Sequence, residues 1–122
     1  MSAPDNMPYG PPALRELVVG LHDFFAEEVV PELDEPLRYH VRVAVGVLAV
    51  VARELELGPA FADAHRERLR AFGAGDDAEL ADAIRGGTLD DRFDTLRCVL
   101  LVDATERVAV ANPAELAGGA DA

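Results

Sequence analysis

The sequence predicts an all-α protein, an antiparallel helical bundle of about five helices, three of them long. Apolar residues recur at steps of three and four along most of the chain, which is the spacing of one face of a helix. Short stretches rich in Gly, Pro and Asp separate these segments. Half of the 122 residues are apolar, but only 6% are aromatic and Trp is absent. The core must therefore consist mainly of Leu, Val and Ala, which favours close packing of helices.

The length predicts a single domain with one core. Residues 1–12, "MSAPDNMPYGPP", are rich in Pro and polar residues and are predicted to form a flexible N-terminal arm. The helical bundle is predicted to cover residues 13–113. Residues 114–122 contain mostly small side chains, so a flexible C-terminal tail that frays is expected there.

The first two helices are predicted from Ala13 to Val30, ended by Pro31, and from Asp34 to Leu57, ended by Gly58-Pro59. Alternating valines between Val41 and Val47 also fit a strand. However, the segment continues into "ARELEL", a strong helix former, and is much longer than the usual strand of about 5 to 6 residues. Its length therefore favours a helix.

Three further helices are predicted over residues 59–72, 78–85 and 91–111. Asp76 or Asp77 caps the short middle helix, and Gly86-Gly87 ends it. Asn112-Pro113 ends the last helix, because the residue before a proline disfavours the helical conformation.

The chain carries 23 acidic against 11 basic residues, a net charge of −12. A field of this sign repels phosphate backbones and anionic lipids, so neither nucleic acid nor a membrane is an expected partner. The longest apolar run, from Val41 to Ala52, contains Arg42 and is shorter than the roughly 20 residues that span a bilayer.

Cys98 is the only cysteine, which excludes an intramolecular disulfide. It lies in the apolar stretch "LRCVLL" and is expected to be unreactive. The N-terminus lacks the basic and apolar regions of a signal peptide. These observations predict a cytoplasmic protein.

Arg42 interrupts the most apolar run of the chain, "VRVAVGVLAVVA". At about 100° per residue, it belongs to one narrow stripe of the predicted helix. The other members of this stripe are Arg38, Gly46, Ala49, Arg53 and Glu56. The small residues would let another backbone approach, or leave a groove with an arginine at each end.

Three interpretations of the stripe remain open. In the first, Arg42 pairs inside the core with Asp103 or Glu106, because Asp103 interrupts the last helix as Arg42 interrupts the second. In the second, the stripe is the subunit interface of a homodimer. In the third, the arginines hold the phosphate or carboxylate of a ligand. The candidate binding or interface residues are Arg38, Arg42, Arg53, His40, Asp103 and Glu106.

His40 and His65 lie on apolar sides of their helices, so each is expected to be a hydrogen-bonded core histidine. A metal site could combine them with Glu54 or Asp63. The spacing does not support it, because the chain has no HExxH, no pair of His four residues apart and no Glu-x-x-His motif. No metal site is therefore predicted.

The sequence also contains no motif that indicates a catalytic nucleophile or a cofactor-binding site. The only serine, Ser2, lies in the predicted arm, and no His stands at an interpretable spacing from a threonine. The glycine pairs form neither a P-loop nor a dinucleotide fingerprint, because none follows a strand. We therefore predict no cofactor and no catalytic residues.

Four short elements occur in order along the chain: "EEVVP", "HVRVA", "RELELGP" and "VANP". Together with "DDAELADAIRGG" they resemble the bacterial domain-of-unknown-function 6285 family, over about Pro12 to Leu116. The family has no established catalytic residues. Its members are typically encoded beside an aminoglycoside or choline kinase-like phosphotransferase and an acyl-CoA dehydrogenase. The resemblance thus implies an accessory part in acyl or lipid metabolism.

Two functions are expected from these observations. The first is a non-catalytic accessory or interaction module, homodimeric, that binds a kinase-like phosphotransferase; it predicts an exposed apolar patch or groove. The second is a protein or enzyme that holds an anionic or acyl ligand with Arg38, Arg42 and Arg53 and uses His40 as acid or base. The second function predicts a cavity in which the arginines converge.

Overall fold

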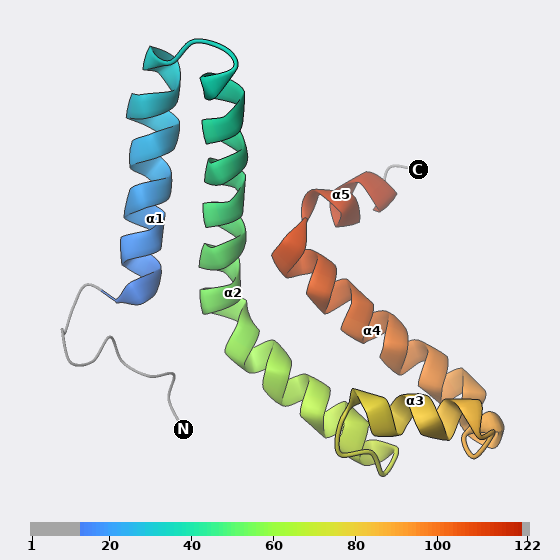
Figure 1. Cartoon of the computed structure of the whole chain (residues 1–122). Helices are drawn as coiled ribbons and strands as arrows, with labels where there is room; N and C mark the ends of the chain where they lie inside the picture. Colours follow the sequence, from blue (N-terminus) through green and yellow to red (C-terminus); the bar gives the residue numbers. More distant parts are fainter. Residues whose placement is uncertain (1–12, 121–122) are drawn as a thin grey trace. The chain divides into compact units, whose positions relative to one another are not determined.

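The computed structural model describes residues 13–120. Within this range the protein is all-α, with five α-helices and no strand (Figure 1). The predicted fold class is confirmed. The predicted N-terminal arm, residues 1–12, lies outside the described residues.

The chain divides into two compact units, Met1–Pro59 and Ala60–Ala122, and we describe each by itself. The single helical domain over residues 13–113 stays a prediction.

The first unit is a helical hairpin. Helix α1, Leu14–Phe24, continues into a π-helical turn, Phe25–Val29, and a 3₁₀ turn, Val30–Glu32, that contains Pro31. The chain then becomes extended at Leu33, so the helical segment ends at Glu32, two residues past the predicted Val30, with Pro31 inside its last turn. Helix α1 and the first half of α2 run side by side in opposite directions (Figure 1).

Helix α2, Leu37–Ala71, is 35 residues long and contains Pro59. The prediction of two helices, 34–57 and 59–72, separated by Gly58-Pro59, is therefore wrong. A proline inside a helix removes one backbone hydrogen bond and costs about 3 kcal/mol. The strong helix formers "ARELEL" and "HRERLRA" on either side offset this cost. The helix also rules out the strand considered for the valines.

The second unit holds a buried apolar cluster that is drawn from the end of α2, from α3 (Asp77–Arg85), from α4 (Phe93–Ala111) and from the connections between them. Its members are Leu69, Phe72, Ala74, Leu80, Leu89 and Leu96. The guanidinium of Arg92 lies 4.4 Å from the centre of the Phe72 ring, a cation–π contact at the edge of this cluster.

Local polar contacts set the ends of these helices. Gly73 has a φ of 74°, and the backbone N–H of Ala74 donates to Leu69 O at 3.0 Å, which closes the end of α2. Asp76 accepts from the backbone N–H of Glu79 at 2.8 Å, and the Glu79 carboxylate accepts from Gly75 N–H at 2.6 Å. Asp76 is thus the cap of α3, one of the two predicted residues.

Residues 114–120 form a fifth helix, α5 (Ala114–Ala120), where the sequence predicts a fraying tail. Pro113 supplies a fixed φ before the first turn, and Glu115 carries negative charge within that turn. The backbone N–H of Glu115 donates to Asn112 O at 3.1 Å. These local contacts start a helix that the small side chains alone do not suggest.

Candidate functional site

Helix α1 carries a stripe of exposed large apolar side chains. Leu14, Leu17, Leu21 and Phe24 are 52%, 47%, 51% and 51% exposed. Their steps of three, four and three place them on one face of the helix. Among the described residues of the first unit, Val30 is the one large apolar residue that is buried. A hairpin of two helices leaves much of its apolar surface uncovered.

An apolar hollow of about 470 Å³ continues this stripe onto α2. It is lined by Phe25, Val41, Ala44, Val47 and Leu48. The rings of Phe24 and Phe25 meet edge to face at 5.6 Å, so the stripe and the hollow are continuous. We call the four stripe residues and the five lining residues together the apolar face.

A second hollow, of about 480 Å³, contains both Arg38 and Arg42, and we call it the arginine hollow. Its other lining residues are Ala26, Val30, Pro31 and Val45. Val41 of the apolar hollow and Val45 of the arginine hollow are four residues apart on α2, about one helical turn. The arginine hollow and the apolar face are therefore neighbours on α2, with no lining residue in common.

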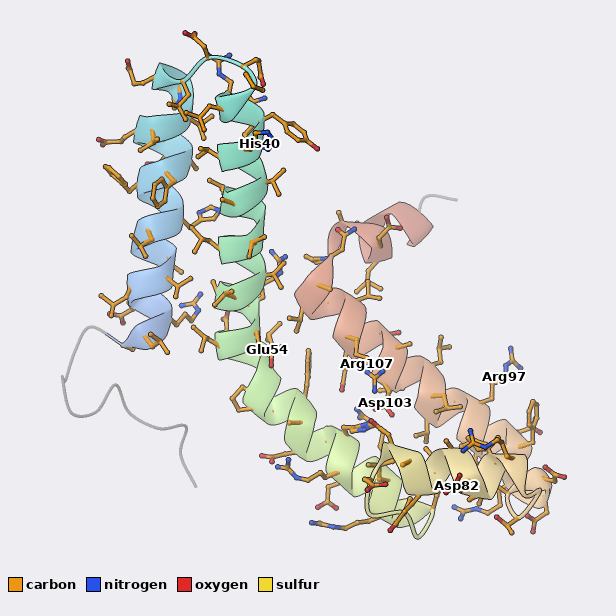
Figure 2. All side chains as sticks on the ribbon, in the orientation of Figure 1. His40, Glu54, Asp82, Arg97, Asp103 and Arg107 are labelled. Atoms are coloured by element: carbon orange, nitrogen blue, oxygen red, sulfur yellow. The ribbon has the colours of Figure 1, made fainter. Side chains whose placement is uncertain are left out.

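Two of the three arginines of the predicted stripe on α2, Arg38 and Arg42, line the same hollow. Arg42 is exposed, not buried in a core seam. Arg53 is half-buried and does not line the arginine hollow. His40 is exposed near the start of α2 (Figure 2), and its ring centroid lies 5.6 Å from that of Tyr39 in an edge-to-face arrangement. The prediction of a core histidine at position 40 is wrong, because the His40 side chain is exposed.

Asp103 and Glu106 on α4 belong to a charged network of the second unit. Asp103 is the one charged residue that is buried in the described part of the chain. Its Oδ1 lies 2.6 Å from Nε of Arg68 and its Oδ2 lies 3.0 Å from Nδ1 of His65. The second guanidinium arm of Arg68 donates to Glu106 at 2.5 Å. Arg68 is thus the partner of both carboxylates within the second unit, and the pairing of Arg42 with Asp103 or Glu106 stays a prediction.

The network extends to α3. The Nε2 atom of His65 lies 2.8 Å from Asp77 Oδ1, and Arg107 approaches the other oxygen of Asp77 at 3.8 Å. Figure 2 shows Asp103 and Arg107 on α4. His65 is thus half-buried and hydrogen-bonded, as predicted, but its partners are two carboxylates.

The hydrogen bond to Glu106 raises the pKa of Arg68 above its ordinary value, and the bond and charge of Asp103 raise it further against the opposing effect of burial. Both nitrogens of His65 and both oxygens of Asp103 are engaged within the network. These contacts hold α2, α3 and α4 together and leave little capacity for a ligand.

Arg68 was missed by the sequence analysis, although a signal exists. His65 and Arg68 are three residues apart on α2, as Asp103 and Glu106 are on α4, so each pair lies on one helix face. Leu69 and Phe72 follow on the same side of α2 and are buried. A basic pair beside an apolar stripe predicts an acidic pair on the helix that covers it.

The remaining candidates are reported for the described residues alone. Cys98 is exposed on α4, and the prediction that its thiol is unreactive stays a prediction. Between residues 13 and 120, no group of three or more His, Cys, Asp or Glu side chains is arranged to hold a metal ion. None of the described helices is long and apolar enough to span a bilayer.

These features define a class: an all-α protein of two helical units, with an apolar face and an arginine hollow on the first and a charged network within the second. The family model "Domain of unknown function (DUF6285)" matches residues 31–114. The chain belongs to this family. The comparisons with curated proteins and with solved structures found no match.

Proposed function

We propose that this protein is a non-catalytic accessory module that binds a kinase-like phosphotransferase through the apolar face of its N-terminal hairpin. The exposure of Leu14, Leu17, Leu21 and Phe24 carries the proposal. A continuous exposed apolar surface of this kind is typical of a protein–protein interface. Its apolar hollow is suited to receive a large side chain of a partner, as the pockets at the centre of interfaces do.

The choice of partner rests on the family. Members of this family are typically encoded beside a kinase-like phosphotransferase and an acyl-CoA dehydrogenase, so the proposed setting is acyl or lipid metabolism in the bacterial cytoplasm. The acidic chain, with a net charge of −12, also favours a partner whose surface is basic around the contact.

In the absence of the phosphotransferase, a second copy of the chain covers the same face. The steps of three, four and three on α1 are those of a coiled-coil seam, and two hairpins that join along it form a four-helix arrangement. The free protein is therefore expected to be a homodimer that exchanges its second copy for the phosphotransferase.

The test is co-expression of the full chain with the phosphotransferase encoded beside it, each carrying the tag in turn. We expect co-purification with the wild-type chain. The variant Leu21→Glu places a charge in the centre of the stripe and should abolish capture, because a charge buried without a partner in an interface is costly. Light scattering of the variant alone should give a monomer.

The matched control is Leu101→Glu on α4. Leu101 is 66% exposed, so it receives the same substitution on a comparably exposed leucine of the second unit. Capture should persist in this control, and circular dichroism should show unchanged helix content in both variants. Equal loss of capture in the two variants, or no capture by the wild type in either tag orientation, contradicts the proposal.

A further inference from the structure

Arg38 presents a buried donor that has no acceptor. Its Nε has no exposed surface and no hydrogen-bond partner. Leaving a buried polar group unsatisfied is costly, and a charged one more so, which makes such groups rare in folded proteins. This donor belongs to a residue that lines the arginine hollow.

Arg42 lines the same hollow from one turn further along α2. No ion pair of Arg38 or Arg42 occurs among residues 13–120. None of the residues that line the hollow is acidic. Two guanidinium groups therefore share one hollow without a neutralising carboxylate from its walls, in a protein with twice as many acidic as basic residues.

The rest of the hollow is apolar. Ala26, Val30, Pro31 and Val45 form its other walls, and Val30 is buried. Its volume of about 480 Å³ lies within the range of small-molecule sites, which is roughly 300 to 1,000 Å³. A ligand that fits these walls has a charged end for the arginines and a short aliphatic body for the valines.

We infer that the arginine hollow binds a small aliphatic oxyanion, with its carboxylate or phosphate group between Arg38 and Arg42 and its chain against Val30 and Val45. Guanidinium groups bind both oxyanions through paired, charge-assisted hydrogen bonds. The site shares no lining residue with the apolar face that is proposed to contact the phosphotransferase.

The experiment is titration of the ¹⁵N-labelled full chain, followed by two-dimensional NMR, with n-butyl phosphate, butyrate, inorganic phosphate and n-butanol in separate arms. We expect saturable shifts of the amides around Arg38, Arg42 and Val45 with butyl phosphate, butyrate or both. The arm that binds more tightly identifies the headgroup. Arg42→Gln should weaken the binding by about tenfold, because it removes one charge-assisted contact from an exposed position that the fold does not need.

Arg97→Gln is the matched control, because Arg97 is an exposed arginine of α4 whose loss changes the net charge equally. Binding should be unchanged in this variant. The inference is overturned if no oxyanion shifts these amides, if n-butanol binds as tightly as the oxyanions, or if Arg97→Gln weakens binding as much as Arg42→Gln. Equal binding of inorganic phosphate and butyl phosphate overturns the aliphatic part of the inference. Arg38→Gln provides a second variant, with its folding checked by the same spectra.

Discussion

At the scale of single residues, whether a charged side chain is buried and paired or exposed depends on which charged groups lie on the helix packed against it. Asp103 is 8% exposed, and its two oxygens are shared between Arg68 and His65. Arg42 is a similar interruption of an apolar run, yet it is exposed and lines a hollow without an acidic wall. Substitution of one partner of a buried pair therefore measures how much the network contributes to the free energy of unfolding.

Asp103→Asn should lower the free energy of unfolding by about 2 kcal/mol, less than the loss for a fully buried pair because Arg68 and His65 keep some exposure. The asparagine retains the shape but removes the charge that faces Arg68. Urea denaturation measures the difference. Asp82→Asn on α3 is the control, since Asp82 pairs with Arg85 at the surface, and a change within about 0.5 kcal/mol is expected there. Equal effects of the two substitutions contradict a buried network.

Two glycines should respond to alanine with opposite signs. Gly46 lies inside α2 with nothing within 4 Å of an added Cβ, so Gly46→Ala should raise the free energy of unfolding by about 1 kcal/mol. Gly73 has a φ of 74°, so Gly73→Ala should lower it by about 1 kcal/mol. Chemical denaturation of both variants checks the signs. A gain at Gly73 excludes the positive φ.

At the scale of helices, α2 shows that a local stop signal in the sequence does not always end a helix. The Gly58-Pro59 pair is a standard stop signal, but the helix continues through it from Leu37 to Ala71. The chain on both sides prefers a helix, so one missing hydrogen bond does not end it. The start of α3 at the Asp76 cap was predicted correctly, because the capping contact lies within a few residues of the signal. The first helical segment ends at Glu32, one residue past Pro31.

Pro59→Ala distinguishes one continuous helix from two. In a continuous helix, alanine restores a backbone hydrogen bond and should raise the free energy of unfolding by up to about 3 kcal/mol. A proline that begins a separate helix is favourable there, so its replacement would be neutral or destabilising. Thermal unfolding followed by circular dichroism measures the change. Pro113→Ala, before the first turn of α5, serves as the control, and a change within about 0.5 kcal/mol is expected.

At the scale of the whole molecule, burial is distributed unevenly. The second unit contains the buried cluster of Leu69, Phe72, Ala74, Leu80, Leu89 and Leu96, whereas Val30 is the one large apolar residue buried in the described part of the first. A helix with few buried contacts opens at low free energy. Local stability should therefore differ between the units.

Amide hydrogen exchange, measured by mass spectrometry at concentrations that keep the chain monomeric, should show fast exchange in α1 and the slowest exchange in α4 around Leu96 and Val110, which are buried. Addition of the phosphotransferase should slow exchange in α1 and leave α4 unchanged. Equal protection of α1 and α4 in the monomer contradicts the uneven burial.

The sequence by itself determined the all-α class, most helix ends, the cap at Asp76 and the family, because helical periodicity and capping are contacts between residues within a few positions of each other. Tertiary structure decided which side of each helix is covered and which charges meet. In the folded chain Arg68 pairs with Asp103 and Glu106, and Arg42 lines an open hollow. His40 and the apolar stripe on α1 are exposed to solvent. These outcomes depend on packing between residues far apart in the chain, and a hairpin without a third helix cannot cover the apolar residues that its own sequence supplies.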